Sequence, residues 1–352
     1  MNIKLAFLGD IYSASGLENY WLSDDLRQIL LSHDLVSCNL EAPLTIASTP
    51  ESKIGPSLKQ PPSVNNQCLT SGINIFNLAN NHLMDHGSPG VKSSLDSLKD
   101  TKSNYLGIGY KPISFKLHGL TITLISGCEH EFGVIPSFEL ESGVAWINDP
   151  QIDSNIIHAK ANGHFVVIQA HAGEEASLPL PEWRSRYQHL IDLGADLVIA
   201  HHPHAPQGWE KYHHKMIYYS LGNFYFLDPI ISSSSKGIIV SLSIAPNHTY
   251  KVKVIPTLQT HNQVQSNLSA MKNLQKLSRQ IISKSYIAQA NKQALMLWKR
   301  YYSKYYLRSV SSNPLSNLLG NKFNYPMILH NQMIESHRWT INRALNQLIK
   351  NK

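Results

Sequence analysis

The sequence lacks any long apolar run, and this excludes a protein that crosses the membrane through apolar helices. A helix that spans a bilayer needs about 20 consecutive apolar residues, and no such run occurs. The opening MNIKLAFLGD is too short and too soon charged to be a secretory signal peptide. We therefore expect a cytoplasmic protein, with any membrane contact being peripheral to the inner membrane.

Cysteine is also scarce. The chain has only Cys38, Cys68 and Cys128, an odd number without the CxxC spacing of a thiolate metal site. This argues against both a disulfide framework and a zinc-thiolate centre. Cys38 and Cys128 fall in apolar, strand-like runs, so we expect them to be buried free thiols.

Acidic residues are almost missing from the last quarter of the chain. Residues 1–264 hold 17 Lys and Arg against 23 Asp and Glu, a net charge of −6. Residues 265–352 hold 14 Lys and Arg against the single acid Glu335, a net charge of +13. Such asymmetry predicts an anionic partner for the basic segment, although packing of that segment on the acidic body is an equally simple explanation.

The alternation of short apolar runs with helix-spaced patterns predicts an α/β fold with parallel strands. Strand-like runs and intervening helical patterns both recur as far as about residue 260. We expect strands at 3–10, 35–41, 73–82, 121–130, 164–171, 196–204, 216–226, 237–244 and 250–255, and helices at 17–32, 90–102 and 182–194. The proline-rich stretch 48–66 is predicted to be a surface loop, which could also gate a nearby site.

The pattern changes beyond residue 264. Apolar residues then recur at three- and four-residue steps towards residue 306, a break follows at 312–325, and another helix is predicted at 328–349. We therefore divide the chain into a body, 1–264, and a basic helical C-terminal extension, 265–352.

Polar side chains gather where the predicted strands end. Asp10, Glu41, Asn81, His171 and the run HHPH (201–204) all lie at the carboxyl ends of apolar runs. In parallel sheets these ends lie along one edge, where ligands bind. Carboxylate, amide and imidazole groups suit a divalent ion such as manganese, zinc or iron. The sequence thus predicts a metal site at this edge.

Each of these residues also has an ordinary structural explanation. Asp10 could cap a helix, Asn81 could be a turn residue and His171 a hydrogen-bonded core histidine. His204 could be a loop residue after Pro203, and His201 stays outside our predicted ligand set. Their shared placement at strand ends favours a site over these separate explanations.

Six sequence blocks carry a family resemblance. They are LGD (8–10), NLEAPLT (39–45), NLANNHLMDHG (77–87), HAGEE (171–175), LIDLGADLVIAHHPHAPQ (190–207) and IYYSLGNFYF (217–226). Their order and wording resemble the bacterial capsule-synthesis CapA family (poly-γ-glutamate capsule), within the calcineurin-like metallophosphoesterase superfamily. The resemblance implies a four-layer α-β-β-α metallophosphoesterase-like sandwich, here with a C-terminal helical appendage. It covers about 3–226, and the basic segment lies outside it.

The resemblance also implies roles for individual residues. The metal ligands would be Asp10, Glu41, Asn81, His171, His202 and His204. His82 would act on the substrate as a proton donor or electrostatic clamp, with Asp85 orienting its imidazole. Glu175 and Asn223 would line the substrate pocket.

Three departures from the family pattern matter. Tyr12 stands where the wider superfamily has a histidine, so the site would hold one ion or two. The bridging acid is Glu41, longer than the usual aspartate. Ala172 and Ala176 replace aromatic residues, so the substrate cannot be transferred from relatives.

Two functions follow from these observations. The first is metal-dependent hydrolysis, by metal-activated water, of a phosphoester or an amide in the biosynthesis of a capsule, poly-γ-glutamate or exopolysaccharide. The second is a non-catalytic capsule-assembly component, with segment 265–352 docking on anionic polymer, a membrane or a capsule-synthesis complex. Nucleic-acid binding through the Lys, Arg and Tyr residues of 299–308 is the weakest alternative, because tyrosines at helical spacing usually pack.

Overall fold

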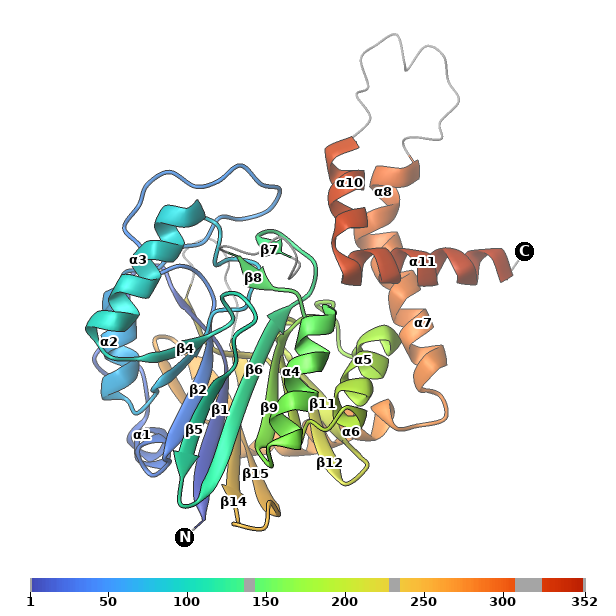
Figure 1. Ribbon diagram of the computed structural model, residues 1–352. Helices are drawn as coiled ribbons and strands as arrows, with labels where there is room; N and C mark the ends of the chain where they lie inside the picture. The colour runs from blue at the N-terminus through green and yellow to red at the C-terminus, as the bar shows by residue number, and fades with distance from the viewer. Residues whose placement is uncertain (1, 136–142, 228–234, 308–324, 351–352) are drawn as a thin grey trace.

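A computed structural model of the chain describes residues 2–135, 143–227, 235–307 and 325–350. Two β-sheets packed face to face form its centre (Figure 1). The first has the order β16-β15-β14-β1-β2-β3-β4, with β13 paired to β1. Its strands are β1 (Ile3–Ser13), β2 (Leu35–Leu40), β3 (Ile75–Asn77), β4 (Asn104–Leu106), β13 (Asn223–Leu227), β14 (Lys236–Ile244), β15 (Tyr250–Thr260) and β16 (Gln263–Ser266).

The second sheet has the order β11-β12-β10-β9-β6-β5. Its strands are β5 (Ile113–Leu117), β6 (Leu120–Cys128), β9 (Phe165–His171), β10 (Leu197–His201), β11 (Pro206–Tyr212) and β12 (Lys215–Leu221). A small parallel pair, β7 (Val134–Ile135) with β8 (Val144–Ala145), lies apart from both sheets.

Helices cover the outer face of each sheet. Side chains of α1 (Asp24–Leu31), α2 (Ser63–Thr70) and α3 (Gly87–Asp100) pack into one apolar cluster with the first sheet. Side chains of α4 (Pro150–Ala161) and α5 (Pro181–Asp192) pack into another with the second sheet. A third cluster, drawn from both sheets, fills the space between them. The predicted α-β-β-α sandwich is therefore confirmed.

The central strands are parallel, as predicted. β1, β2, β3 and β4 pair parallel in the first sheet, and β6, β9, β10 and β12 pair parallel in the second. Their carboxyl ends therefore meet along common edges, the arrangement that the strand-end argument required.

Several predicted bounds were wrong. The run 216–226 is two strands in different sheets, β12 and β13, separated at Gly222, which has a φ of 67°. The first helix begins only at Asp24, and α2 occupies the end of the stretch predicted to be a loop. Helix α4 was not predicted at all.

The segment beyond β16 is helical, as predicted. It holds a 3₁₀ turn (Leu268–Ala270), α6 (Met271–Ile281), α7 (Tyr286–Leu297), a π-helical turn (Trp298–Tyr302), α8 (Ser303–Leu307), α10 (Tyr325–Met333) and α11 (Glu335–Lys350). The predicted break lies almost wholly outside the described residues. Helix α6 packs against β11, while α7 and α11 lie next to α5 at the right of the view (Figure 1).

The scarce residues behave as expected. All three cysteines are buried and free. Within the described ranges, no helix combines the length and apolar character that crossing a bilayer requires.

A candidate metal centre beneath a two-walled cavity

The first candidate ligand, Asp10, lies within β1 and not at its end. The register of β1 against β13 shifts at this residue, which is fully buried. The backbone N–H of Asp10 donates to Gly222 O at 3.0 Å. Gly9 permits this approach, because a Cβ at that position would lie 1.9 Å from the same oxygen. The glycine of LGD thus sets the position of the aspartate.

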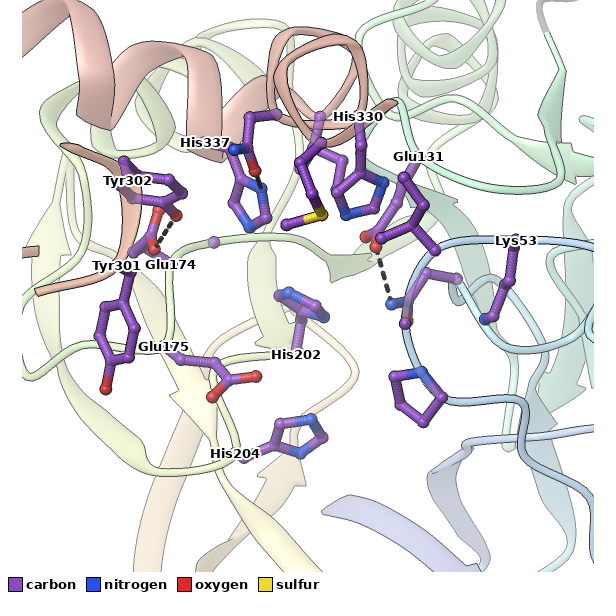
Figure 2. A pocket seen from close by; sticks show the side chains of 18 of the residues that line it. Lys53, Glu131, Glu174, Glu175, His202, His204, Tyr301, Tyr302, His330 and His337 are labelled. Carbon is purple, nitrogen blue, oxygen red and sulfur yellow. Dashed lines mark hydrogen bonds between the residues drawn. The ribbon is translucent and has the colours of Figure 1, made fainter. Parts of the chain in front are cut away.

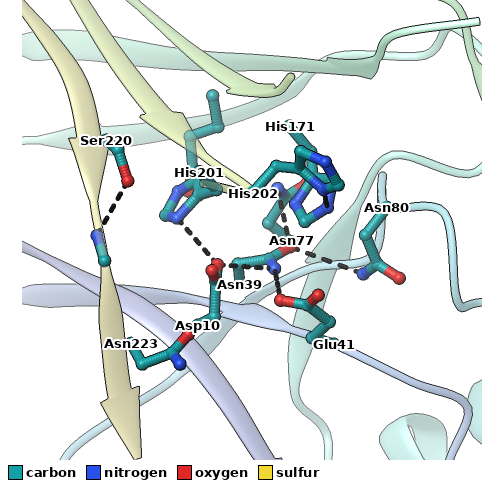
Figure 3. A network of polar contacts seen from close by, with 12 residues as sticks. Asp10, Asn39, Glu41, Asn77, Asn80, His171, His201, His202, Ser220 and Asn223 are labelled. Atoms are coloured by element: carbon teal, nitrogen blue, oxygen red, sulfur yellow. Dashed lines mark hydrogen bonds and ion pairs between the residues drawn. The ribbon is translucent and has the colours of Figure 1, made fainter. Parts of the chain in front are cut away.

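Asn39 joins Asp10 to Glu41 (Figure 3). Its amide Nδ2 donates to Asp10 Oδ1 at 2.9 Å and to Glu41 Oε2 at 3.3 Å. Each carboxylate thus has one oxygen held by this amide. The second oxygens, Asp10 Oδ2 and Glu41 Oε1, are buried without a hydrogen-bond partner.

His171, Asn81 and His202 form the adjacent part of the site. His171 Nε2 lies 3.1 Å from Asn81 Oδ1 and 3.1 Å from His202 Nδ1. The other ring nitrogen of His171, Nδ1, is buried without a hydrogen-bond partner. Three ligand-type atoms thus converge from the ends of β9 and β10 and from the turn after β3.

His204 faces both carboxylates. Its Nδ1 lies 3.7 Å from Asp10 Oδ2 and 2.9 Å from Asn223 Oδ1, and its Nε2 lies 3.5 Å from Glu41 Oε1. His202 and His204 have positive φ values of 95° and 52°. Non-glycine residues held in such conformations carry backbone strain and cluster at functional sites.

A divalent cation fits these residues. Asp10, Glu41 and His171 each offer a ligand atom, and the three atoms lie within 4.8 Å of one another. Two buried carboxylates side by side, each with an oxygen that has no hydrogen-bond partner, are costly unless a cation or proton compensates them. The donor types, oxygen and imidazole nitrogen, are those that manganese, zinc and iron accept.

The pKa directions agree with this donor set. Burial, and then the charge of Asp10, raise the pKa of Glu41 well above its usual value. Burial also tends to raise the pKa of Asp10, but its contact with the His201 imidazole prevails, so that pKa is lowered. Burial, with the His202 charge adding to it, holds the pKa of His171 well below its usual value. His171 is therefore kept in the neutral form that binds metals.

His82 lies beside this cluster with its ring fixed. Its Nδ1 lies 2.7 Å from Asp85 Oδ2, and Lys53 Nζ forms an ion pair with Asp85 Oδ1. The backbone N–H of Leu58 donates to Asp85 Oδ2 at 2.6 Å. Burial lowers the pKa of His82, while the hydrogen bond to Asp85 acts in the opposite direction. The stretch 48–66, which was predicted to be a surface loop, therefore supports Asp85 through Lys53 and Leu58.

A cavity of about 600 Å³ opens over these residues. The body lines it with side chains that include His82, Glu175, His202, His204 and Asn223. Leu297, Tyr301, Tyr302, Lys304, Tyr305, Met327, His330, Asn331, Ile334 and His337 line it from the C-terminal helices. Figure 2 shows His330 and His337 facing His202 and His204 across this space. The cavity therefore has two walls, one from each part of the chain.

All the predicted site residues thus lie in one region, and the sequence argument missed several of their neighbours. Asn39, which links the two acids, was not among the predicted site residues. His201 is fully buried with its Nδ1 3.4 Å from Asp10 Oδ1, so HHPH supplies three imidazoles and not two. Glu131 accepts from Asn81 Nδ2 at 3.0 Å, and it forms a second potential metal-binding group with Glu129 and His202.

Tyr12 occupies the position where the superfamily has a histidine, and its side chain packs among apolar residues. It is buried in an apolar cluster with Ala42, Leu58 and Phe226. Its ring centroid lies 5.0 Å from that of Phe226. It therefore forms part of the packing beneath the site.

Comparisons with known proteins identify relatives of this chain. The model of the family described as "Bacterial capsule synthesis protein PGA_cap" matches residues 4–228. The capsule biosynthesis protein CapA of Bacillus anthracis is 30% identical over 198 residues, covering 53% of this chain and 48% of that protein. The PGA biosynthesis protein CapA of Bacillus subtilis (strain 168) is 32% identical over 201 residues, covering 52% of this chain and 50% of that protein. The chain thus spans about half the length of these curated relatives.

Several solved structures are also similar. The Thermus thermophilus sulfate thiohydrolase SoxB overlaps 78% of this chain and 60% of its own, with a TM-score of 0.44 and 10% identity. All six sequence blocks lie within the range that the family model matches, whereas the C-terminal helices lie outside it. On the family match, which covers more than half of its length, the chain belongs to the bacterial capsule synthesis protein PGA_cap family.

Proposed function

We propose that this chain is a metal-dependent hydrolase that acts on a phosphoester or an amide in the biosynthesis of an anionic capsule polymer. One observation carries the proposal. Asp10, Glu41 and His171 bring buried ligand atoms together, while Asp10 Oδ2, Glu41 Oε1 and His171 Nδ1 lack hydrogen-bond partners. Buried polar atoms in folded proteins are normally paired, so these three unpaired atoms favour a bound ligand that pairs with them.

The residues around these three would complete the site. His202, His204 and Asn81 lie within hydrogen-bonding or ion-pairing distance of them and present nitrogen or oxygen atoms. A divalent cation bound there would supply a Lewis acid and lower the pKa of a bound water. The description of the family as capsule synthesis proteins supports a substrate among phosphorylated or γ-glutamyl compounds.

His82 is the candidate for proton transfer. Since Asp85 occupies its Nδ1, Nε2 is the nitrogen left for a substrate. In hydrolysis, water adds to the phosphorus or carbonyl carbon, the bond to the leaving oxygen or nitrogen breaks, and the leaving atom takes up a proton. His82 would provide that proton through Nε2, while the contact between Nδ1 and Asp85 Oδ2 holds the ring in place.

The test separates chemistry from structure. His82→Ala should abolish turnover of phosphoester and γ-glutamyl substrates while metal content stays within about 10% of wild type. His158→Ala, a substitution of an exposed histidine on α4, is the matched control and should change neither quantity. Equal loss of metal and turnover in His82→Ala would mean that His82 holds the site together and takes no part in the reaction.

A further inference from the structure

The C-terminal helices are attached to the body through three buried carboxylates near the candidate metal centre. Glu174 accepts from Tyr302 Oη at 2.7 Å and from Thr340 Oγ1 at 2.8 Å. Glu129 Oε2 accepts from the backbone N–H of Ser336 at 2.8 Å, in the first turn of α11. Glu174 belongs to the HAGEE turn, which carries the predicted site residues His171 and Glu175, and Glu129 directly follows β6.

The third carboxylate comes from the helices themselves. Glu335, the single acid of residues 265–352, is buried and points into the body. It accepts from the backbone N–H of His130 at 2.7 Å, from Trp146 Nε1 at 3.0 Å and from Asn148 Nδ2 at 2.9 Å. The acid is thus used for attachment and not exposed in the cavity.

On the side of the C-terminal helices, the cavity wall combines apolar side chains with polar ones. Among the described residues that line the cavity from the helices, none is acidic. Asn331 is 2% exposed and its Oδ1 pairs with His337 Nδ1 at 3.2 Å, while its Nδ2 has no hydrogen-bond partner. Lys304 is exposed, with its Nζ 4.9 Å from the centre of the Tyr305 ring. Tyr301 and His330 add further polar groups.

We propose that this wall, centred on Lys304 and Asn331, binds a second anionic group of the substrate while the cluster of Asp10, Glu41 and His171 holds the reacting group. His337 Nδ1 donates to Asn331 Oδ1 and so orients the Asn331 amide. A carboxylate or a phosphate can accept a hydrogen bond from the unpaired Asn331 Nδ2 and can form an ion pair with the Lys304 ammonium. The inference rests on the proposed function, because it takes the metal-ligand cluster as the reaction centre. It assigns substrate recognition to helices that lie beyond the family match.

The experiment measures binding and therefore needs no turnover. Calorimetry follows the titration of a γ-linked glutamate pentamer, its uncharged γ-linked glutamine counterpart and inorganic phosphate into the manganese-loaded full chain. Lys304→Gln and Asn331→Asp should each weaken binding of an anionic probe about tenfold without loss of manganese. The glutamine pentamer should bind the wild type at least tenfold more weakly than the glutamate pentamer or phosphate does.

Matched variants keep the test decisive. Asn346→Ala, on the exposed surface of α11, should bind as wild type. If buried Asn331→Asp fails to fold, the exposed Lys304→Gln carries the test alone. An effect on the pentamer identifies a carboxylate subsite, and an effect on phosphate alone identifies a phosphate subsite. Unchanged binding of both anions in Lys304→Gln, or no binding of either to wild type, overturns the inference.

The two proposals fail separately. If the wild type binds the anionic probes through this wall but hydrolyses no substrate, the wall stands and the hydrolase proposal falls. If turnover depends on His82 but no variant of the wall alters binding, the hydrolase proposal stands and the wall falls.

Discussion

Tyr302 donates its hydroxyl to Glu174 Oε1 at 2.7 Å, across 128 residues of sequence. The tyrosine belongs to the π-helical turn between α7 and α8, and the glutamate to the HAGEE turn that begins with the candidate ligand His171. Burial, and then the charge of Glu174, raise the pKa of Tyr302 far above its usual value, so the hydroxyl stays a donor. The pair fixes the C-terminal helices beside the metal cluster.

Removing this hydroxyl should destabilise the protein. We expect Tyr302→Phe to lower the free energy of unfolding by about 1–2 kcal/mol, because Glu174 loses a buried donor. Chemical denaturation measures the change. Tyr301→Phe, at the exposed neighbouring position, is the control and should have no effect beyond about 0.5 kcal/mol. Equal stability of the two variants would show that the Tyr302 contact contributes nothing.

The crossover between the sheets makes a second prediction. Gly222 has a φ of 67°, and a Cβ there would lie 2.4 Å from Lys236 O and 2.5 Å from Pro206 Cδ. Gly222→Ala should therefore cost about 3 kcal/mol of stability. Gly119 also has a positive φ, 81°, but a Cβ there would meet nothing within 4 Å. Gly119→Ala should therefore lower the stability by only about 1 kcal/mol. Thermal unfolding of both variants tests the contrast, and similar losses would contradict it.

Metal binding should stabilise the folded chain. With free manganese at 100 times its dissociation constant, the free energy of unfolding should rise by about 2.7 kcal/mol, and a chelator should reverse the gain. The physical reason is the pair of buried carboxylates, whose mutual repulsion a cation removes. Asp10→Ala should gain no stability from manganese. A gain of the same size in that variant would place the ion somewhere else.

Much of the site could be predicted because its residues lie in local strand-end patterns. His171 ends β9, and His202 directly follows β10, as the apolar runs indicated. Asp10 lies close to Glu41 and His171, but the prediction that it ends a strand was wrong, because β1 continues to Ser13. An irregularity in strand pairing, and not the end of the strand, brings Asp10 to the site, and apolar periodicity does not reveal such an irregularity.

The remaining features depend on contacts distant in sequence. The run 216–226 looks like one strand, and only the close packing around Gly222 shows why it must divide between sheets. The basic segment showed its charge and helical period, but neither pattern indicates that Glu335 points inward or that Asn331 lines the cavity. Its position over the site arises from pairs such as Glu174 with Thr340, which no local pattern contains.

The central claim is that Asp10, Glu41 and His171 hold a divalent ion. Elemental analysis of the purified protein, after supplementation with manganese, zinc and iron, tests it most directly for wild type, Asp10→Ala and His171→Ala. The account predicts near-stoichiometric metal in wild type and its loss in both variants. A wild type without metal, or variants that keep the metal content of wild type, would contradict it.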